Sequence, residues 1–182
     1  MNIAIMSHTK KQDLMVQFCT AYCGVLSKHS VCATNATGRM VADATGLPVH
    51  LFLSREGYLK KITPQSLRMA SDQKYKDGDG PFLQWEANNR DELLVFTDRQ
   101  QCYKTRLSDF DDAKASVLGD YLPTKLAMDQ EERGVWACIP GDYRRQLLFF
   151  FDNGKVARVA LSAYQTQTRR KKLTGAYSDK SP

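Results

Sequence analysis

Hydrophobic and polar positions follow one pattern over the first third of the 182-residue chain and another beyond it. Up to residue 54, short apolar runs alternate with segments of helical periodicity. The runs typical of buried strands are Asn2–Met6, Ser30–Thr34 and Pro48–Leu53. The helical segments are Asp13–Leu26, with an apolar stripe of Leu14, Phe18, Tyr22 and Val25 or Leu26, and Thr37–Ala44. This order predicts a βαβαβ unit with a parallel sheet.

From Ser54 onward, glycines and polar turns separate apolar runs such as Glu92–Thr97 and Gln146–Phe151. These are signals of strands and hairpins, and helical periodicity is confined to Asp111–Leu118. The expected fold class is therefore α+β. We expect an N-terminal unit over residues 1–54, a region of antiparallel β blades over 55–164 and a basic tail over 165–182.

One short segment occurs three times in the second part, at offsets of 43 and 54 residues. A turn residue (Gly57, Gln100, Gly154) precedes an apolar residue (Leu59, Cys102, Val156) and then a cation (Lys61, Lys104, Arg158). The flank that follows also recurs, as Leu107–Phe110 and Leu161–Tyr164. A period of about 45 to 50 residues with several strands per unit is typical of propeller-like or pinwheel blades. About two and a half such blades are present, and their open strand edges predict closure against the N-terminal unit or self-association.

The composition and charge of the chain limit the classes of function that it can have. The chain is 42% hydrophobic and 25% charged, as in ordinary soluble proteins. Its net charge of +6 is concentrated at the end, because residues 165–182 carry five basic side chains and one acidic one. No apolar run is long enough for a membrane helix, so we expect a cytoplasmic protein with no membrane partner. Five cysteines without a CxxC pair indicate buried free thiols rather than a disulfide framework or a metal site, and no cofactor is expected.

The second part resembles the C-terminal β-pinwheel of the A subunits of bacterial DNA gyrase and topoisomerase IV. Ser54–Ile62 matches the "T-x-x-G-Y-x-K-R" opening of a blade, and Leu94–Arg99 and Phe150–Val156 look like the same strand–turn–strand in later blades. The resemblance implies duplex DNA binding at a basic rim, without the cleaving region. The gyrase box is not recognisable, because Thr168–Leu173 lacks its paired glycines.

The first part is similar to the N-terminal third of methylglyoxal synthase, which converts dihydroxyacetone phosphate. The family's "A-H-D-K-K" appears as Ser7-His8-Thr9-Lys10-Lys11 and its "G-T-T-G" as Asn35-Ala36-Thr37-Gly38. The segment that carries the family's catalytic aspartate does not follow, so no base matches the proton-abstracting role. The chain reads as a chimera joined near Leu53-Ser54, and we expect it not to be an enzyme.

Three functions follow from these observations. The first is a non-catalytic module that contacts duplex DNA phosphates with little sequence specificity. Its candidate contacts are Lys60, Lys61, Lys104, Arg106, Lys155, Arg158, Arg169, Arg170, Lys171 and Lys172, although solvated cations on exposed strands would give the same pattern. Trp85, Trp136 and Phe149–Phe151 are expected to fill cores.

The second function is a protein-interaction or inhibitor protein acting on a topoisomerase or nuclease, or self-associating, through its open strand edges. The third is residual triose-phosphate binding without synthase activity. Its anion-binding candidates are Lys10, Thr34, Thr37 and Gly38, which would lie where loops meet helix N-termini. A purely structural loop is the alternative for these four residues.

Overall fold

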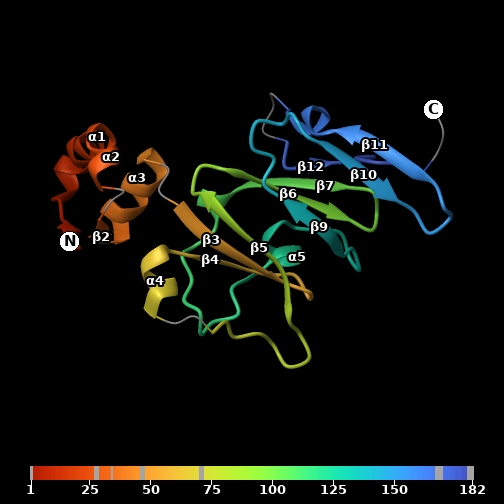
Figure 1. Cartoon of the computed structure of the whole chain (residues 1–182), viewed down its shortest axis with the longest axis horizontal. Helices are drawn as coiled ribbons and strands as arrows, with labels where there is room; N and C mark the ends of the chain where they lie inside the picture. The colour runs from red at the N-terminus through yellow and green to blue at the C-terminus, as the bar shows by residue number, and fades with distance from the viewer. Residues whose placement is uncertain are drawn as a thin grey trace.

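The computed structural model describes residues 2–26, 29–33, 35–45, 48–69, 72–166 and 170–179. An N-terminal α/β segment lies at one end of the molecule, and antiparallel β structure makes up the rest (Figure 1). The expected α+β class is confirmed.

The N-terminal segment contains two parallel strands and the helices that cover them. Its elements are β1 (Asn2–Ile5), η1 (Thr9–Lys11), α1 (Gln12–Ala21), α2 (Cys23–Leu26), β2 (Ser30–Ala33) and α3 (Asn35–Thr45). Strand β1 pairs in parallel with β2, as predicted for this pair. Its small core comprises Ile5, Cys19, Leu26 and Val41.

The face of α1 that is buried differs from the predicted one. Leu14, Phe18, Tyr22 and Val25 are each more than half exposed, whereas Cys19 is fully buried and Met15 and Val16 pack against the small core. The predicted stripe was wrong for Leu14, Phe18 and Tyr22 because α1 packs on α3, and that contact selects the neighbouring face of the helix; its alternative last member, Leu26, is buried.

The third strand of the expected parallel unit belongs to an antiparallel sheet instead. Strand β3 (Pro48–Ser54) lies between β4 (Tyr58–Ile62) and β5 (Pro81–Asn88), antiparallel to both. A tight turn joins β3 directly to β4, and closing this local hairpin costs less chain entropy than forming a longer crossover connection. Residue 54, the expected boundary, is thus the last residue of β3.

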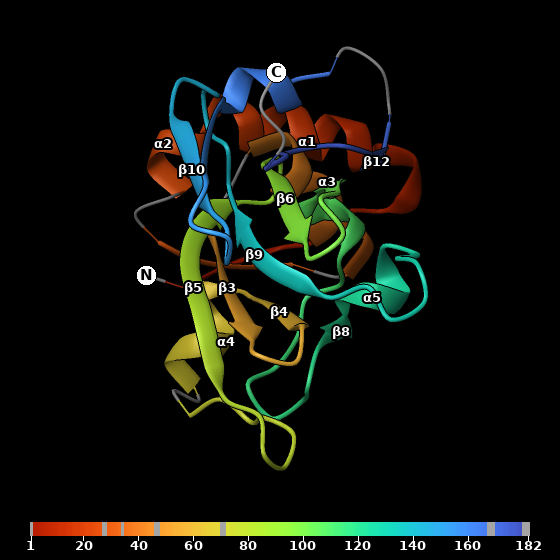
Figure 2. The same ribbon diagram turned by 90° about the vertical axis from the view of Figure 1, so that its right-hand side faces the viewer.

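The β region consists of two four-stranded sheets and one hairpin, in agreement with about two and a half blades (Figure 2). We call them blades 1, 2 and 3. Blade 1 has the order β5-β3-β4-β8, blade 2 has β12-β7-β6-β9, and blade 3 is β10-β11. The remaining strands are β6 (Glu92–Thr97), β7 (Cys102–Arg106), β8 (Asp120–Tyr121), β9 (Gly134–Cys138), β10 (Gln146–Phe150), β11 (Val156–Ala160) and β12 (Lys172–Leu173).

The sequence repeat coincides with the strand register. The cations Lys61, Lys104 and Arg158 stand opposite Leu51, Leu94 and Leu148 in the central hairpins of the three blades. The three turn residues all adopt positive φ, at 91° for Gly57, 57° for Gln100 and 77° for Gly154. A short helix then follows each hairpin: α4 (Pro64–Met69), η2 (Leu107–Asp109) and η3 (Leu161–Tyr164).

The expected helical stretch at Asp111–Leu118 is not a helix. Its backbone bonds to neighbouring segments: the Ala113 amide donates to the Lys61 carbonyl at 2.7 Å, and the Lys74 amide donates to the Ala115 carbonyl at 2.9 Å. The helix that does follow is the short α5 (Leu122–Lys125). These hydrogen bonds to neighbouring segments outweigh the helical periodicity of the stretch.

Two hydrophobic clusters fill the β region. One contains Leu51, Leu53 and Leu59 of blade 1 together with Leu93 and Val95 of blade 2. The other joins blade 2 to blade 3 through residues that include Phe96, Leu161, Tyr164 and Tyr177. Cys102 and Cys138 belong to this second cluster, and burial raises the pKa of their thiols to about 12 and about 11. They are free, as is buried Cys19, in agreement with the predicted free thiols.

Candidate nucleic-acid interface

The three repeated cations occupy equivalent positions but different environments. Lys61 is 5% exposed, and its Nζ lies 2.7 Å from Asn89 Oδ1 and 3.2 Å from Asp112 Oδ1. Lys104 is 11% exposed and pairs with Glu92 at 3.2 Å, with its ammonium over the Tyr143 ring. Arg158 is exposed on blade 3. The difference arises because the segments that carry Asn89 and Asp112 cover Lys61 and the segment that carries Tyr143 covers Lys104, whereas Arg158 lies on β11, which pairs only with β10 in the described chain.

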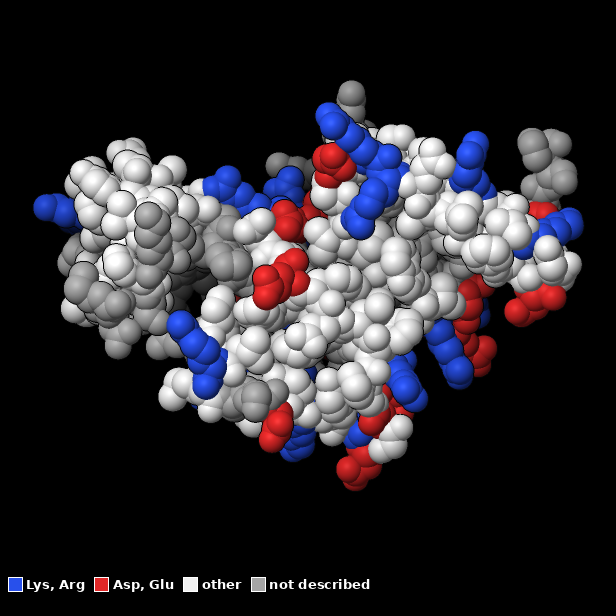
Figure 3. All heavy atoms as spheres, viewed as in Figure 1, with Lys and Arg blue, Asp and Glu red and all other residues white. Residues whose placement is uncertain are grey.

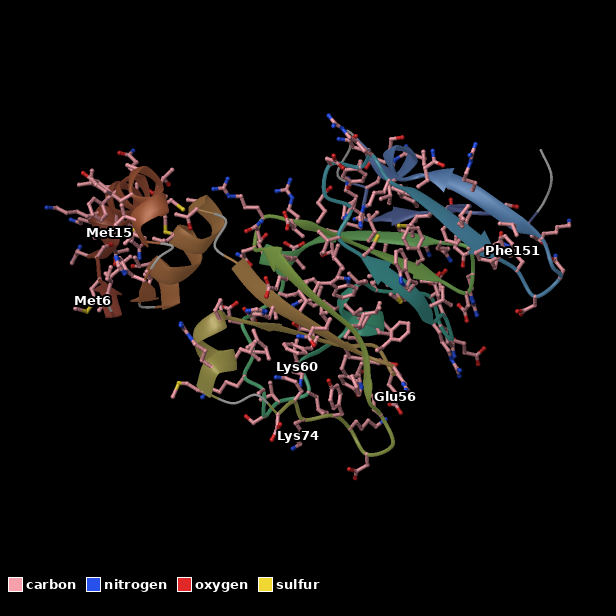
Figure 4. All side chains as sticks on the ribbon, viewed as in Figure 1. Met6, Met15, Glu56, Lys60, Lys74 and Phe151 are labelled. Atoms are coloured by element: carbon pink, nitrogen blue, oxygen red, sulfur yellow. The ribbon has the colours of Figure 1, made fainter. Side chains whose placement is uncertain are left out.

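Lys60 is also an internal residue. Its side chain is 1% exposed, and its Nζ donates to the carbonyls of Lys74 at 2.8 Å and Ala115 at 3.4 Å (Figure 4). The ammonium lies 5.0 Å from the centre of the Tyr75 ring. Burial lowers the pKa of Lys60. Lys60 and Lys61 therefore hold loops onto β4, and their ammonium groups are not presented to a ligand at the surface.

Among the candidates before the predicted tail, Arg106, Lys155 and Arg158 are exposed. Arg106 shares with Arg90 a recess of about 280 Å³, bordered by Glu92 and Tyr143. Arg90 was not among the predicted contacts, because it lies outside the repeated segment. Lys155 follows the turn of blade 3, and its Nζ donates to the Asp179 carbonyl at 2.9 Å.

The predicted basic tail is partly docked onto blade 2. Lys172 belongs to β12, pairs with Asp129 at 2.7 Å and lies over the Tyr103 ring. Arg170 and Lys171 are exposed, whereas Arg169 lies outside the described residues. Positive side chains in the visible view are dispersed along the outline and interspersed with acidic ones, rather than gathered into one patch (Figure 3).

A second candidate site is the N-terminus of α3. Thr37 is 1% exposed, and its Oγ1 has no hydrogen-bond partner among the described residues. Gly38 follows in the same helical turn, and Lys10 is exposed in η1. The fourth anion-binding candidate, Thr34, lies outside the described residues. Thr37 thus places a buried hydroxyl in the first turn of an 11-residue helix, the position in which backbone amides and the helix dipole favour small anions.

A third candidate site is a groove of about 400 Å³ between blades 1 and 2. Its floor includes Leu53, Val95, Leu122 and Met128, and the side chains of Arg55 and Arg133 border it. Phe82, Tyr121 and Trp136 also line the groove and are 45%, 43% and 38% exposed. Sequence reasoning missed this groove because its residues come from separated segments, and it expected Trp136 to fill a core.

Among the described residues, no helix is long and apolar enough to cross a membrane. Histidine, cysteine and acidic side chains of the same residues form no cluster that could hold a metal ion.

Comparison with known proteins supports both predicted resemblances, although no family model matches the chain. Methylglyoxal synthase from Caldicellulosiruptor saccharolyticus is 58% identical over 53 residues, which are 29% of this chain and 38% of that enzyme. The synthase from Oceanobacillus iheyensis is 52% identical over 54 residues, covering 30% and 39% of the two chains. The chain thus spans less than two fifths of these curated relatives.

The structural neighbours match the larger part of the chain. The C-terminal domain of DNA topoisomerase IV superposes with a TM-score of 0.64 and 26% identity, over 70% of this chain and 41% of that one. The E. coli ParC C-terminal domain gives a TM-score of 0.50 at 18% identity, over 61% and 44% of the two chains. The chain therefore combines a segment similar to methylglyoxal synthase with blades similar to the C-terminal domain of topoisomerase IV.

Proposed function

We propose that the β region is a non-enzymatic module that binds duplex DNA through its phosphates, with little preference for base sequence. The observation that carries this proposal is the likeness to the topoisomerase IV C-terminal domain, together with the exposed Arg158 and Lys155 on blade 3. The contacting residues proposed are Arg106, Lys155, Arg158, Arg170 and Lys171. Lys60, Lys61, Lys104 and Lys172 are engaged within the protein and act structurally.

A titration of duplex DNA at two salt concentrations tests this function. Each phosphate contact lowers the slope of log K against log salt by about 0.9, so five contacts give a slope of about −4.5. Affinity then falls about 500-fold between about 50 and 200 mM salt. Equal elution of the protein from duplex DNA and from a neutral resin would overturn the proposal.

A second candidate function is protein interaction through blade 3. In the described chain β10 has an unpaired edge, and its residues Gln146–Phe150 include no charge. Leu148, Phe150 and Val156 on the outer face are 57%, 76% and 55% exposed. An uncharged, apolar strand edge is prone to pair with another strand. Binding to a purified topoisomerase A subunit that persists after nuclease treatment would favour this function over DNA binding, and sedimentation at several concentrations would detect self-association.

A third candidate, for the N-terminal segment, is triose-phosphate binding without synthase activity. It is favoured by the buried Thr37 hydroxyl in the first turn of α3, which has no hydrogen-bond partner among the described residues. Calorimetry with dihydroxyacetone phosphate should show binding that is lost in Thr37→Val, without formation of methylglyoxal. Unchanged binding by the variant would show that the hydroxyl is structural, and methylglyoxal production would contradict the non-enzymatic assignment.

A further inference from the structure

The groove between blades 1 and 2 exposes three aromatic side chains contributed by three separate segments. Phe82 comes from β5, Tyr121 from β8 and Trp136 from β9. Each is more than a third exposed, although large aromatic side chains contribute most when they are buried. The groove has a volume of about 400 Å³, which lies within the range of small-ligand sites, about 300–1,000 Å³.

Two of these rings are supported from behind by a second ring. Tyr121 packs against Tyr58 with ring centres 4.9 Å apart, and Trp136 stacks on Phe96 at 6.1 Å. Trp136 also stands opposite Phe96 in the β6–β9 pairing, which fixes its backbone. The rings are therefore held in place, so little side-chain entropy is lost when a planar ligand stacks on them.

The charges around the groove favour an anionic ligand. Arg55 and Arg133 line it and are exposed, and neither forms an ion pair among the residues that the structure describes. The two carboxylates of the lining are already engaged. Glu56, labelled in Figure 4, lies at the turn of the first hairpin and pairs with Lys76 at 2.8 Å. Glu132 is 3% exposed and accepts hydrogen bonds from Thr97, Tyr103 and the Asp129 amide.

We propose that this groove binds single-stranded nucleic acid, with unpaired bases stacked on Phe82, Tyr121 and Trp136 and phosphates on Arg55 and Arg133. Aromatic platforms beside cations are the general means of holding single strands without reading sequence. In a duplex the faces of the bases are already stacked on one another, so rings in a groove would gain no such contact. The site uses none of the residues proposed above for duplex binding, and the two proposals stand or fall separately.

The fluorescence of Trp136 provides a direct test, because Trp85 is the other of the two tryptophans in the chain. In the full chain carrying Trp85→Phe, an oligothymidylate should quench the emission of Trp136, whereas a blunt duplex of the same length should leave it unchanged. In anisotropy titrations with labelled oligothymidylate, Phe82→Leu should weaken binding about tenfold, which corresponds to about 1.4 kcal/mol. Arg133→Gln should weaken it and make it less dependent on salt.

Arg99→Gln is the matched control, since Arg99 is an exposed arginine of the β6–β7 turn that does not line the groove. It should bind oligothymidylate as the parent does, and melting curves of all variants verify folding. Three results would overturn the proposal: equal quenching by duplex and single strand, unchanged affinity of Phe82→Leu, or quenching by a proline-rich peptide but not by oligothymidylate. Weaker duplex binding with a shallower salt slope in Arg158→Gln, with oligothymidylate binding intact, would show that the two surfaces are distinct.

Discussion

Replacing Lys60 by methionine separates a structural cation from a DNA contact. The substitution keeps the length of the aliphatic chain but removes the ammonium that bonds to the carbonyls of Lys74 and Ala115. Leaving a buried acceptor unpaired costs about 1–3 kcal/mol. The Ala115 carbonyl keeps its hydrogen bond from the Lys74 amide, so the Lys74 carbonyl is the acceptor that loses its partner. With some compensation from the apolar side chain, we expect a loss of about 1–3 kcal/mol in the free energy of unfolding. For a chain of this size that lowers the melting temperature by roughly 2–12 °C.

The companion variant is Arg158→Gln, which alters the equivalent strand of blade 3 at an exposed position. Its unfolding free energy should change by no more than about 0.5 kcal/mol. The slope of log K against log salt for duplex binding should become shallower by about 0.9. Lys60→Met, measured well below its melting temperature, should keep the parent slope.

The reasoning would be refuted by the reverse pattern. A normal melting temperature with a shallower salt slope in Lys60→Met would mean that the ammonium reaches DNA, contrary to its burial. Destabilisation of Arg158→Gln with an unchanged slope would mean that the exposed arginine is structural. Differential scanning fluorimetry and fluorescence anisotropy supply the two readouts.

Three further predictions concern the blade framework. At Gly119 (φ +92°) an added Cβ would lie 2.3 Å from the Leu59 carbonyl oxygen, so Gly119→Ala should lower the free energy of unfolding by about 3 kcal/mol or more in chemical denaturation. Gly78→Ala (φ +83°), with open space around it, should lower it only by the conformational cost of the positive φ, about 1–2 kcal/mol. Equal losses would contradict the close approach of Gly119 to β4. Gln100→Gly should raise stability by about 0.5–1 kcal/mol, since glycine removes the cost of the positive φ and adds a smaller entropic one; a lower melting temperature would refute this. Burial alone would raise the pKa of Glu132, but its hydrogen bonds outweigh burial and lower that pKa below the ordinary 4.5. The carboxylate therefore stabilises the fold above that pH, and this contribution is lost as the pH falls below it. Denaturation curves of Glu132→Gln should approach those of the parent on acidification, and a difference that stays constant with pH would contradict the assignment.

The hairpins of the blades could be predicted from sequence because their determinants are local. A turn residue and the apolar and charged positions that follow it fix both the reversal and the register, and the structure reproduces both in all three copies. Even Gln100, which stands where the other two copies have glycine, adopts a positive φ. Two hydrogen bonds hold Gln100 there: its amide donates to the Thr97 carbonyl within the turn, and its carbonyl accepts from the Ala176 amide in the segment after β12.

What failed depends on contacts between distant segments. The buried face of α1 is decided by its packing on α3, and β3 is held in the antiparallel sheet by β5, about 30 residues along the chain, as well as by the adjacent β4. Trp136 was expected inside because tryptophan is usually buried, yet the edge strand β9 places it at the rim of a groove. Neither the periodicity of a helix nor the composition of a strand contains these contacts.

The repeat itself was the clearest signal in the sequence, and its functional meaning changes once blades are complete. A cation that recurs in register suggests a row of phosphate contacts, but Lys61 and Lys104 are largely covered, and each has an acidic partner: Asp112 after η2 for Lys61, and Glu92 on the adjacent strand β6 for Lys104. Only at blade 3, where no flanking strand is described, does the same position stay exposed as Arg158. The recurrence of this cation therefore reflects how the interior of a blade is packed, and it does not by itself indicate a phosphate contact. If the proposed function is correct, the contacts with DNA must instead come from cations outside the repeat, such as Arg170 and Lys171, and from blade 3, where Arg158 is exposed.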